Sequence, residues 1–484
     1  MCSALFKSPC QNACPIGMDV PQYLALVRAG RLDDAYKILL RTNPFPAICG
    51  RVCDHQCQSK CRRASSDEAL AIKFVKRFIT DNAKKPNVDP AAMDRKEKIA
   101  VVGSGPAGLT AAKDLALRGY KITVYEELPE AGGMTRYGIP SYRLPRNILA
   151  GEVNDIRALG VDIVCNTRVG RDVSFGTLYE NFDYIYLAPG AHRSQRMGVK
   201  GENLSGVYGG VEFLRDFNMN EDAWLKGAKS LGSRVAVIGG GNSAIDAARC
   251  AVRLGADVTI LYRRSREDMP AADEEILAAL HEGIRIEYFV APLEIHETNG
   301  KVSGISCERM KPGDFDKSGR RKPVPVKGSE FTLSVDAVIA AIGQAPDLSF
   351  VPEGAGIQIN KWDTFDLAMD SKSRTTNAKF YAGGDAVTGP WTVVGAIAAG
   401  HLAAQDIDRD IRMRNGEPPW EAPAEEKIDI PFEIDEETVE TPQAAMPELA
   451  AAARKTNFNE VELGYALDVA IKEASRCLRC DAEV

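Results

Sequence analysis

Two copies of one strand–turn–helix pattern constrain this chain more than any other feature of its sequence. The first reads "KIAVVGSGPAGLTAAKDL" from Lys98, and the second reads "RVAVIGGGNSAIDAAR" from Arg234. In each, a short apolar run ends at a glycine-rich turn that opens a helical pattern, which is typical of parallel strands alternating with helices. We therefore expect an α/β chain built around two nucleotide-binding units.

The first unit has glycine wherever such a turn needs one. Gly103 allows the tight turn, Gly105 lets the backbone approach a pyrophosphate, and Gly108, after Ala107, lets the helix pack close to the strand. Glu126 follows at the end of the next apolar run, where a carboxylate can accept hydrogen bonds from ribose hydroxyls. A turn without a ligand is the alternative interpretation, but the strand, helix and acid together favour a dinucleotide site.

The second unit differs at the corresponding acidic position. Gly239, Gly241 and Ala244 occupy the three turn positions, but no carboxylate ends the next strand, and Arg263 and Arg264 stand there instead. Arginine at this place suits a 2′-phosphate, so NADP is favoured over NAD. A solvated basic turn is the alternative interpretation of the same residues.

A third segment indicates which nucleotide belongs to which unit. "KFYAGGDAVTGPWTVVGAIAAG" predicts a strand, then the turn Gly383, Gly384 and Asp385, then a helix of small apolar residues. The aspartate can accept hydrogen bonds from a polyol chain, and the next helix N-terminus can face a flavin. This segment is similar to the closing part of a flavoprotein's FAD domain, which assigns FAD to the first unit and NAD(P)H to the second.

Cysteines cluster near both ends of the chain. "PAICGRVCDHQCQSKC" places one at every fourth position, "CQNAC" precedes it, and "CLRC" lies near the C-terminus. Zinc, disulfides and an iron–sulfur cluster are the alternatives for such thiols, and disulfides are disfavoured in a long chain of a reducing compartment. The candidate ligands are Cys10, Cys14, Cys49, Cys53, Cys57, Cys61, Cys477 and Cys480.

The order of these patterns predicts four regions. They are a helical cysteine-bearing domain at 1–95, an FAD domain at 96–205 and 340–412, an inserted NAD(P)H domain at 206–339, and a surface linker with a C-terminal helix at 413–484. We expect that helix to begin near Asn459 and to deliver the last two cysteines.

Charge and hydropathy exclude two classes of partner. The 484 residues carry a net charge of −7, so no basic field favours nucleic acid or a membrane surface. No apolar run approaches the ~20 residues that span a bilayer, and the N-terminus does not resemble a signal peptide. We expect a cytoplasmic protein.

Six segments resemble one family along almost the whole chain: "NPFPAICGRVCDHQCQSKC", "GSGPAGL", "GGMTRYGIPSYRLP", "GGGNSAIDAAR", "YRRSREDMPA" and "GGDAVTGP". This family includes the small subunit of glutamate synthase, the N-terminal half of dihydropyrimidine dehydrogenase, and the large subunit of NADH-dependent ferredoxin:NADP oxidoreductase. The resemblance implies a two-domain flavoprotein fold, with an inserted NAD(P) domain and an N-terminal helical iron–sulfur domain, that holds FAD, NAD(P)H and two [4Fe-4S] clusters.

The resemblance also implies roles for individual residues. One cluster would be held by Cys49, Cys53, Cys57 and Cys61. FAD would be lined by Glu126, Gly132, Gly133, Met134, Arg136, Ile139, Arg143, Leu144 and Asp385, and the nicotinamide cofactor by Gly241, Asn242, Ser243, Arg263 and Arg264. The chain departs from the family at "LAPGA", where Pro189 replaces a threonine, and we expect a slightly altered crossing between domains with no loss of FAD.

The second cluster needs ligands from both ends of the chain. Cys10 and Cys14 form a C-x3-C pair followed by proline, and Cys477 and Cys480 form a C-x2-C pair, which together supply four thiolates with ferredoxin-like spacings. The chain ends must then meet. Cys2 is the spare thiol, and the proline leaves room for ligands to be exchanged between the clusters.

The expected reaction is hydride transfer from nicotinamide C4 to flavin N5, followed by single-electron steps through the clusters in either direction. This reaction needs no general acid or base. No Ser-His-Asp set, metal-hydrolase motif or second substrate domain is recognised, so we expect a separate redox partner, a larger catalytic subunit or a ferredoxin, in a hetero-oligomer. The alternatives are a flavin-dependent disulfide reductase that uses "CLRC" as a mobile dithiol tail, and a structural scaffold whose nucleotides are vestigial.

Overall fold

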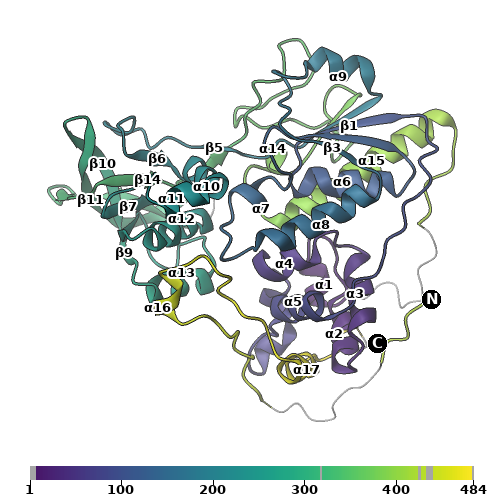
Figure 1. Ribbon diagram of the computed structural model, residues 1–484, viewed down its shortest axis with the longest axis horizontal. Coiled ribbons are helices and arrows are strands. Elements are labelled where there is room, and N and C mark those ends of the chain that lie inside the picture. The colour runs from purple at the N-terminus through teal and green to yellow at the C-terminus, as the bar shows by residue number, and fades with distance from the viewer. Residues whose placement is uncertain (1–6, 317–318, 423–426, 432–439, 482–484) are drawn as a thin grey trace.

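The computed structural model describes residues 7–316, 319–422, 427–431 and 440–481. Figure 1 shows a helical domain beside two sheet-containing domains. The helices of the first domain are α1 (Pro9–Ala13), α2 (Val20–Arg28), α3 (Leu32–Leu40), α4 (Pro46–Val52) and α5 (Ile72–Asn82). Between α2 and α3, Gly30 adopts a φ of +71°, which ends the first helix without side-chain strain.

The second domain is a five-stranded parallel sheet in the order β16-β4-β1-β2-β3. Its first and last strands in the chain lie almost 280 residues apart, so one sheet contains both halves of the predicted FAD domain. The strands are β1 (Lys98–Val102), β2 (Lys121–Tyr125), β3 (Asp162–Val164), β4 (Tyr184–Leu187) and β16 (Phe380–Ala382), and the helices are α6 (Pro106–Ala116), α7 (Met134–Tyr137), α8 (Arg146–Ala158), α9 (Phe175–Asn181), α14 (Asp385–Thr388) and α15 (Val393–Asn415).

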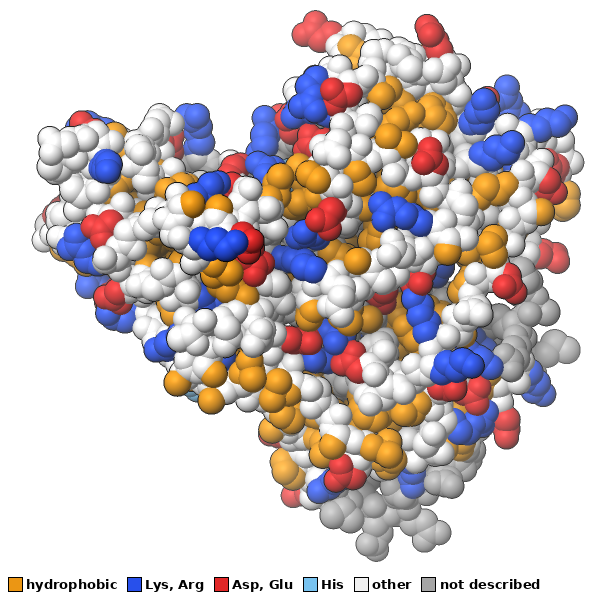
Figure 2. Space-filling model, in the orientation of Figure 1, with side chains coloured by type: hydrophobic (Ala, Val, Ile, Leu, Met, Phe, Trp, Pro, Cys, Tyr) orange, Lys and Arg blue, Asp and Glu red, His pale blue; other side chains and the backbone are white. Residues whose placement is uncertain are grey.

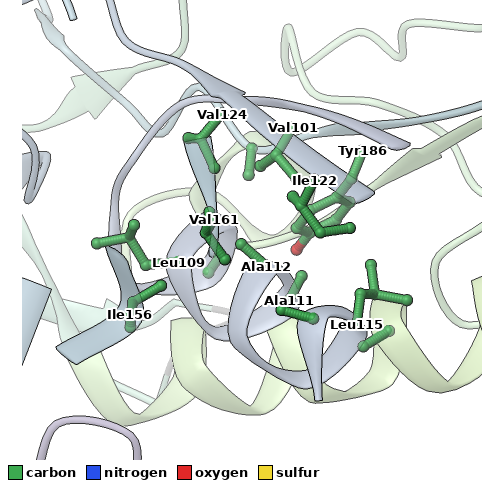
Figure 3. Packing of buried hydrophobic residues seen from close by; sticks show 14 of the residues in the cluster. Val101, Leu109, Ala111, Ala112, Leu115, Ile122, Val124, Ile156, Val161 and Tyr186 are labelled. Atoms are coloured by element: carbon green, nitrogen blue, oxygen red, sulfur yellow. The ribbon is translucent and has the colours of Figure 1, made fainter. Parts of the chain in front are cut away.

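Helix α6 packs between this sheet and α15. In Figure 3, Ala111, Ala112 and Leu115 of α6 lie close to Val101 and Ile122 of the strands. On the other side, a Cβ added to Gly400 of α15 would lie 2.4 Å from the carbonyl oxygen of Ala107. Small residues thus let the two helices approach closely, which holds the end of the split domain against its beginning.

The third domain contains a second five-stranded parallel sheet, in the order β6-β14-β7-β8-β9. An antiparallel group, β10 to β13, adjoins it. The elements are β6 (Val207–Gly209), α10 (Gly210–Met219), α11 (Glu221–Leu225), β7 (Arg234–Ile238), α12 (Asn242–Arg253), β8 (Asp257–Tyr262), α13 (Asp273–His281), β9 (Arg285–Tyr288), β10 (Val290–Thr298), β11 (Lys301–Phe315), β12 (Arg321–Pro325), β13 (Phe331–Leu333) and β14 (Ala337–Ala340).

The chain crosses between the two sheet domains twice, and the two crossings pair with each other. Strands β5 (Arg193–Ser194) and β15 (Gln344–Ala345) form an antiparallel ribbon. Figure 2 shows the molecule hollowed between the two lobes that this ribbon joins. The third domain is therefore an insertion in the second, as the sequence predicted.

The C-terminal segment brings the two ends of the chain together. Helix α17 (Leu467–Ser475), which follows α16 (Ala451–Arg454), packs against α2 (Figure 1). It begins later than the expected Asn459, because the preceding backbone includes Gly464 at a φ of +84°, which is not helical. In the described part of the chain, no helix combines the length and apolarity needed to cross a bilayer.

Candidate functional site

A candidate site is a cleft at the carboxyl ends of β1, β2, β4 and β16. It encloses about 940 Å³, open solvent included. Ligands of open α/β sheets bind at this edge of the strands. Its lining includes these residues predicted from the sequence: Gly103, Gly105, Ala107, Glu126, Gly133, Met134, Gly384 and Asp385.

The three glycines of the first turn have three different environments. Gly103 has a φ of +100°, and a Cβ there would lie 2.2 Å from the carbonyl oxygen of Ala188. A Cβ on Gly108 would lie 2.0 Å from the carbonyl oxygen of Gly103. A Cβ on Gly105 would meet no protein atom within 4 Å. Gly105 therefore faces the open cleft, as expected of the glycine that lets a pyrophosphate approach the backbone.

Glu126 lies at the end of β2 and is 5% exposed. Its carboxylate accepts hydrogen bonds from the Ser104 backbone N–H (3.0 Å), the Ser104 hydroxyl (2.5 Å) and the Leu128 N–H (2.9 Å). Burial raises the pKa of Glu126, and these hydrogen bonds oppose the rise. The carboxylate thus ties the end of β2 to the glycine turn and also lines the cleft.

The opposite wall of the cleft supplies two further polar groups. Asp385 accepts a hydrogen bond from the Trp391 N–H (3.2 Å), and burial raises its pKa to about 6. The buried Nδ1 of His192 has no hydrogen-bond partner among the described residues. Burial, followed by the charge of Arg215, lowers the pKa of His192 to about 4, so its ring is neutral at pH 7. Sequence reasoning missed His192, although it follows the unusual "LAPGA" directly.

These features fit FAD. The cleft combines an open glycine turn, a carboxylate at the end of the second strand, and a buried ring nitrogen that a polar ligand can satisfy. Pro189 also lines the cleft, and the Ala188 N–H donates to the Val102 carbonyl at 2.8 Å. The crossing with proline therefore still closes the cleft.

Several residues that the resemblance assigned to FAD do not line this cleft. Arg143 pairs with Asp246 and Glu275 of the third domain, at 2.8 Å each. Arg136 pairs with Glu130 at 2.7 Å, and Leu144 is fully buried in the core. Direct contact with FAD remains a prediction for Gly108, Gly132, Arg136, Ile139, Arg143 and Leu144.

The second glycine turn repeats the geometry of the first. Gly239 has a φ of +141°, and a Cβ there would lie 2.2 Å from the carbonyl oxygen of Ala341. A Cβ on Gly241 would meet only the Cγ of Pro270, at 3.8 Å. The side-chain oxygen of Asn242 in this turn accepts a hydrogen bond from the Ala272 N–H at 3.0 Å. The Gln344 side-chain amide donates to the Ser243 hydroxyl at 3.1 Å.

The two arginines predicted to select NADP are not equivalent. Arg263 is exposed at the end of β8. Arg264 is 7% exposed and pairs with Asp316 at 2.6 Å. A guanidinium that faces solvent can bind a phosphate without breaking an ion pair. Arg263 is therefore the stronger candidate of the two for binding the 2′-phosphate.

A second pocket, of about 350 Å³ with open solvent included, brings together cysteines from both ends of the chain. Its cysteines are Cys10, Cys61, Cys477 and Cys480. Burial raises the pKa of Cys10 to about 11, and the neighbouring Cys61 and Cys480 add to the rise. Segments near both ends of the described chain therefore meet at this pocket, and Cys61 lines it together with Cys10 and the C-terminal pair. The predicted grouping of Cys14 with them stays a prediction.

Of the other four cysteines, Cys49 and Cys53 lie toward the FAD domain, whereas Cys14 and Cys57 pack in the core of the helical domain. Burial raises the pKa of Cys57 to about 12, and Cys53, Cys14 and Cys10 add to the rise. Cys49 is fully buried, and both Cys49 and Cys53 pack against the core that contains the glycine helix α6. Eight thiols suit two thiolate-bound clusters, although among the described residues no three or more His, Cys, Asp or Glu side chains lie close enough together to hold a single metal ion. Cys2 lies outside the described residues.

Two family models match the chain. The pyridine nucleotide-disulphide oxidoreductase family matches residues 97–400, and the model described as dihydropyrimidine dehydrogenase domain II, 4Fe-4S cluster, matches residues 1–88. The second match confirms the iron–sulfur interpretation of the N-terminal cysteines over zinc and disulfides.

Three curated relatives are similar over most of the chain. The β subunit of NADPH-Fe(3+) oxidoreductase from Geobacter sulfurreducens is 40% identical over 98% of this chain and 75% of its own length. The β subunit of NADP(+)-dependent formate dehydrogenase from Moorella thermoacetica is 41% identical over 98% of this chain and 70% of its own. The small chain of NADPH glutamate synthase from Escherichia coli is 35% identical over 82% of this chain and 87% of its own length.

A solved structure supports the fold. FprA from Mycobacterium tuberculosis, in complex with NADPH, superposes with a TM-score of 0.55 and 21% identity over 67% of this chain and 86% of its own. The predicted family, fold class, cofactor classes and enzyme class are therefore confirmed. The chain belongs to the family of pyridine-nucleotide oxidoreductases with FAD and [4Fe-4S] domains that includes the small chain of glutamate synthase.

Proposed function

We propose that this chain moves electrons between NADPH and a partner protein by way of FAD and two [4Fe-4S] clusters. The observation that carries the proposal is the position of Cys49 and Cys53, which pack against the same core as Ala107 and Leu109 of the glycine helix. The inner thiol group thus adjoins the FAD domain. The outer group lines a pocket formed by α1, α2, the segment around Cys61 and the C-terminal cysteines.

When bound by this chain, FAD would supply hydride chemistry with the nicotinamide, and the clusters would supply single-electron chemistry. The residues of the chain bind and orient these groups. Gly105 and Glu126 would hold the dinucleotide of FAD at the end of β1 and β2, and Gly241 and Arg263 would hold NADPH. Neutral His192 offers a hydrogen bond within the cleft.

We assign the cluster ligands by position in the structure rather than by spacing in the sequence. Cys10, Cys61, Cys477 and Cys480 form the outer cluster site, and Cys14, Cys49, Cys53 and Cys57 form the inner one. Neighbouring ligands in the sequence are thus exchanged between clusters, a feature of two-cluster ferredoxins.

The electron acceptor or donor is a separate protein in this proposal. The relatives named above are β subunits or small chains of larger enzymes. A catalytic subunit that binds over the outer cluster site would make a hetero-oligomer. A cytoplasmic location belongs to the same proposal, because free thiols and [4Fe-4S] clusters suit a reducing compartment.

The disulfide-reductase alternative requires a mobile C-terminal tail. In the structure, helix α17, which precedes the C-terminal cysteine pair, is instead anchored to the helical domain. Its Glu473 is 1% exposed and accepts hydrogen bonds from the backbone N–H groups of Ala71 (2.8 Å) and Ala444 (2.9 Å). Arg476 also pairs with Asp67 at 3.1 Å. The anchored helix favours a fixed cluster ligand over a mobile dithiol.

The test is metal and cofactor analysis of anaerobically purified protein, combined with reduction by NADPH. We expect FAD, about eight iron and eight sulfide per chain, for two four-iron clusters, and bleaching of the flavin before the clusters are reduced. Stoichiometric zinc without sulfide, or flavin without iron, would refute the proposal.

A further inference from the structure

Helix α5 presents three buried cationic side chains to the helical domain, and one of them lacks an acidic partner. Lys73, Lys76 and Arg77 are 4%, 5% and 2% exposed. Spacings of three and four residues place them along one side of the helix. A buried ammonium or guanidinium requires a compensating charge, because removing it from water is costly.

Two of the three cations have carboxylate partners. Lys73 pairs with Glu274, and with Glu462 at 3.8 Å. Arg77 pairs with Asp81 at 3.1 Å and with Glu460 at 2.9 Å. These partners come from the end of α5 itself, from α13 and from the segment before α17.

Lys76 faces a different environment. Among the described residues, its ammonium has neither an ion pair nor a hydrogen bond. Burial lowers the pKa of Lys76, but the charge that four neighbouring cysteines carry as thiolates raises it above its ordinary value, and those cysteines are Cys53, Cys49, Cys57 and Cys14. These are the four cysteines of the inner cluster site.

The packing of α4 on α5 fixes this arrangement. A Cβ added to Gly50 would lie 2.8 Å from the Cα of Arg77, so the two helices are as close as glycine allows. Cys49 precedes Gly50 and Lys76 precedes Arg77 in the chain. The close contact therefore holds the cysteine-bearing helix beside the lysine.

We propose that Lys76 is the fixed counter-charge of the inner cluster and raises the reduction potential of that cluster. The inference rests on the proposed electron route. Four neutral thiols cannot compensate a buried ammonium, whereas a [4Fe-4S] cluster with four thiolates carries a net charge of −2 when oxidised and −3 when reduced. A nearby positive charge stabilises the more negative, reduced state, and local charge is one determinant of such potentials. The inner cluster can then accept an electron from the flavin more readily.

The test compares Lys76→Met, Lys76→Arg and the unaltered full-length protein in a redox titration followed by electron paramagnetic resonance. In Lys76→Met, we expect the equilibrium constant for reduction of the inner cluster to fall at least tenfold. This fall corresponds to a potential lower by 59 mV for one electron. The other cluster is the internal control and should shift less. Lys76→Arg keeps the positive charge and should keep the potential.

Iron content and flavin reduction separate this inference from the proposed function. Both variants should retain FAD, iron and sulfide, and NADPH should reduce the flavin as in the unaltered protein. An unchanged inner-cluster potential in Lys76→Met would overturn the inference. An equal fall of that potential in Lys76→Arg would also overturn it, because the positive charge is kept in this variant. Absence of clusters from the unaltered protein would instead refute the proposed function.

Discussion

The carboxylate of Glu152 accepts a hydrogen bond from the backbone N–H of Ala47 at 2.7 Å and thereby joins the FAD domain to the helical domain. It accepts a second from the N–H of Ile48 at 3.1 Å. These donors lie in the first turn of α4, whose own N-cap, Phe45, provides no side-chain acceptor. A residue of α8 therefore caps the helix that carries Cys49.

Replacing Glu152 by alanine should destabilise the junction of the two domains. The loss of a helix cap costs about 0.5–2 kcal/mol, and two buried N–H groups would lose their acceptor. Urea unfolding should show a lower midpoint for Glu152→Ala than for the unaltered protein. The midpoint of Glu152→Gln, which retains one acceptor oxygen, should lie between those of the other two proteins. Equal midpoints for all three proteins would contradict the role of this contact.

The same carboxyl group predicts a pH dependence of stability. Burial raises the pKa of Glu152 from 4.5 to about 7, although its two backbone hydrogen bonds oppose the rise. Because the folded-state pKa is the higher one, the stabilisation is complete below pH ~4.5 and is lost as the pH rises through ~7. The change amounts to at most about 3 kcal/mol. Thermal unfolding between pH 5 and 8 should show this loss in the unaltered protein and a flatter curve in Glu152→Gln.

The two glycine turns allow a matched test of the nucleotide assignments. Neither Gly105 nor Gly241 has a protein atom close to the position of an added Cβ, so valine at either site should leave the fold intact. Gly105→Val should lose most of its flavin, because the side chain would project toward the pyrophosphate. Gly241→Val should keep its flavin but bind NADPH weakly. Absorbance spectra and NADPH titration measure both effects, and the reverse pattern would exchange the two assignments.

Coenzyme preference should depend on Arg263 more than on Arg264. Loss of a charge-assisted phosphate contact costs about 1.5–3 kcal/mol, so Arg263→Ala should raise the KM for NADPH at least ~10-fold and that for NADH little. Arg264→Ala is the control, and it should mainly reduce stability because it removes the ion pair between Arg264 and Asp316. Equal effects of Arg263→Ala on both coenzymes would remove the basis for preferring NADP.

Serine variants of single cysteines distinguish the two ways of grouping the ligands. If the structural grouping is correct, Cys61→Ser and Cys480→Ser should alter the same cluster signal, and Cys14→Ser should alter the other. The grouping by sequence spacing predicts instead that Cys14→Ser matches Cys480→Ser. Electron paramagnetic resonance of the reduced proteins measures this, and flavin reduction by NADPH should persist in every variant.

The glycine turns, the split FAD domain and the eight cysteines near the chain ends were all predictable from the sequence. Each depends on a local requirement, such as the φ of +100° at Gly103 or the spacing of thiols within a few residues. These requirements select particular residue types at particular places, and a sequence displays them directly.

Only the tertiary structure decided which distant groups meet. It placed Cys61 with Cys10 at the outer pocket, paired Arg264 with Asp316, and left Lys76 facing thiols although Lys73 on the same helix faces carboxylates. The sequence alone shows none of these, because cysteines with equal spacing and cations on one helix look alike until packing determines their neighbours. Burial makes these neighbours important for the free energy of folding, because a charge removed from water is stabilised only by the few groups that lie close to it.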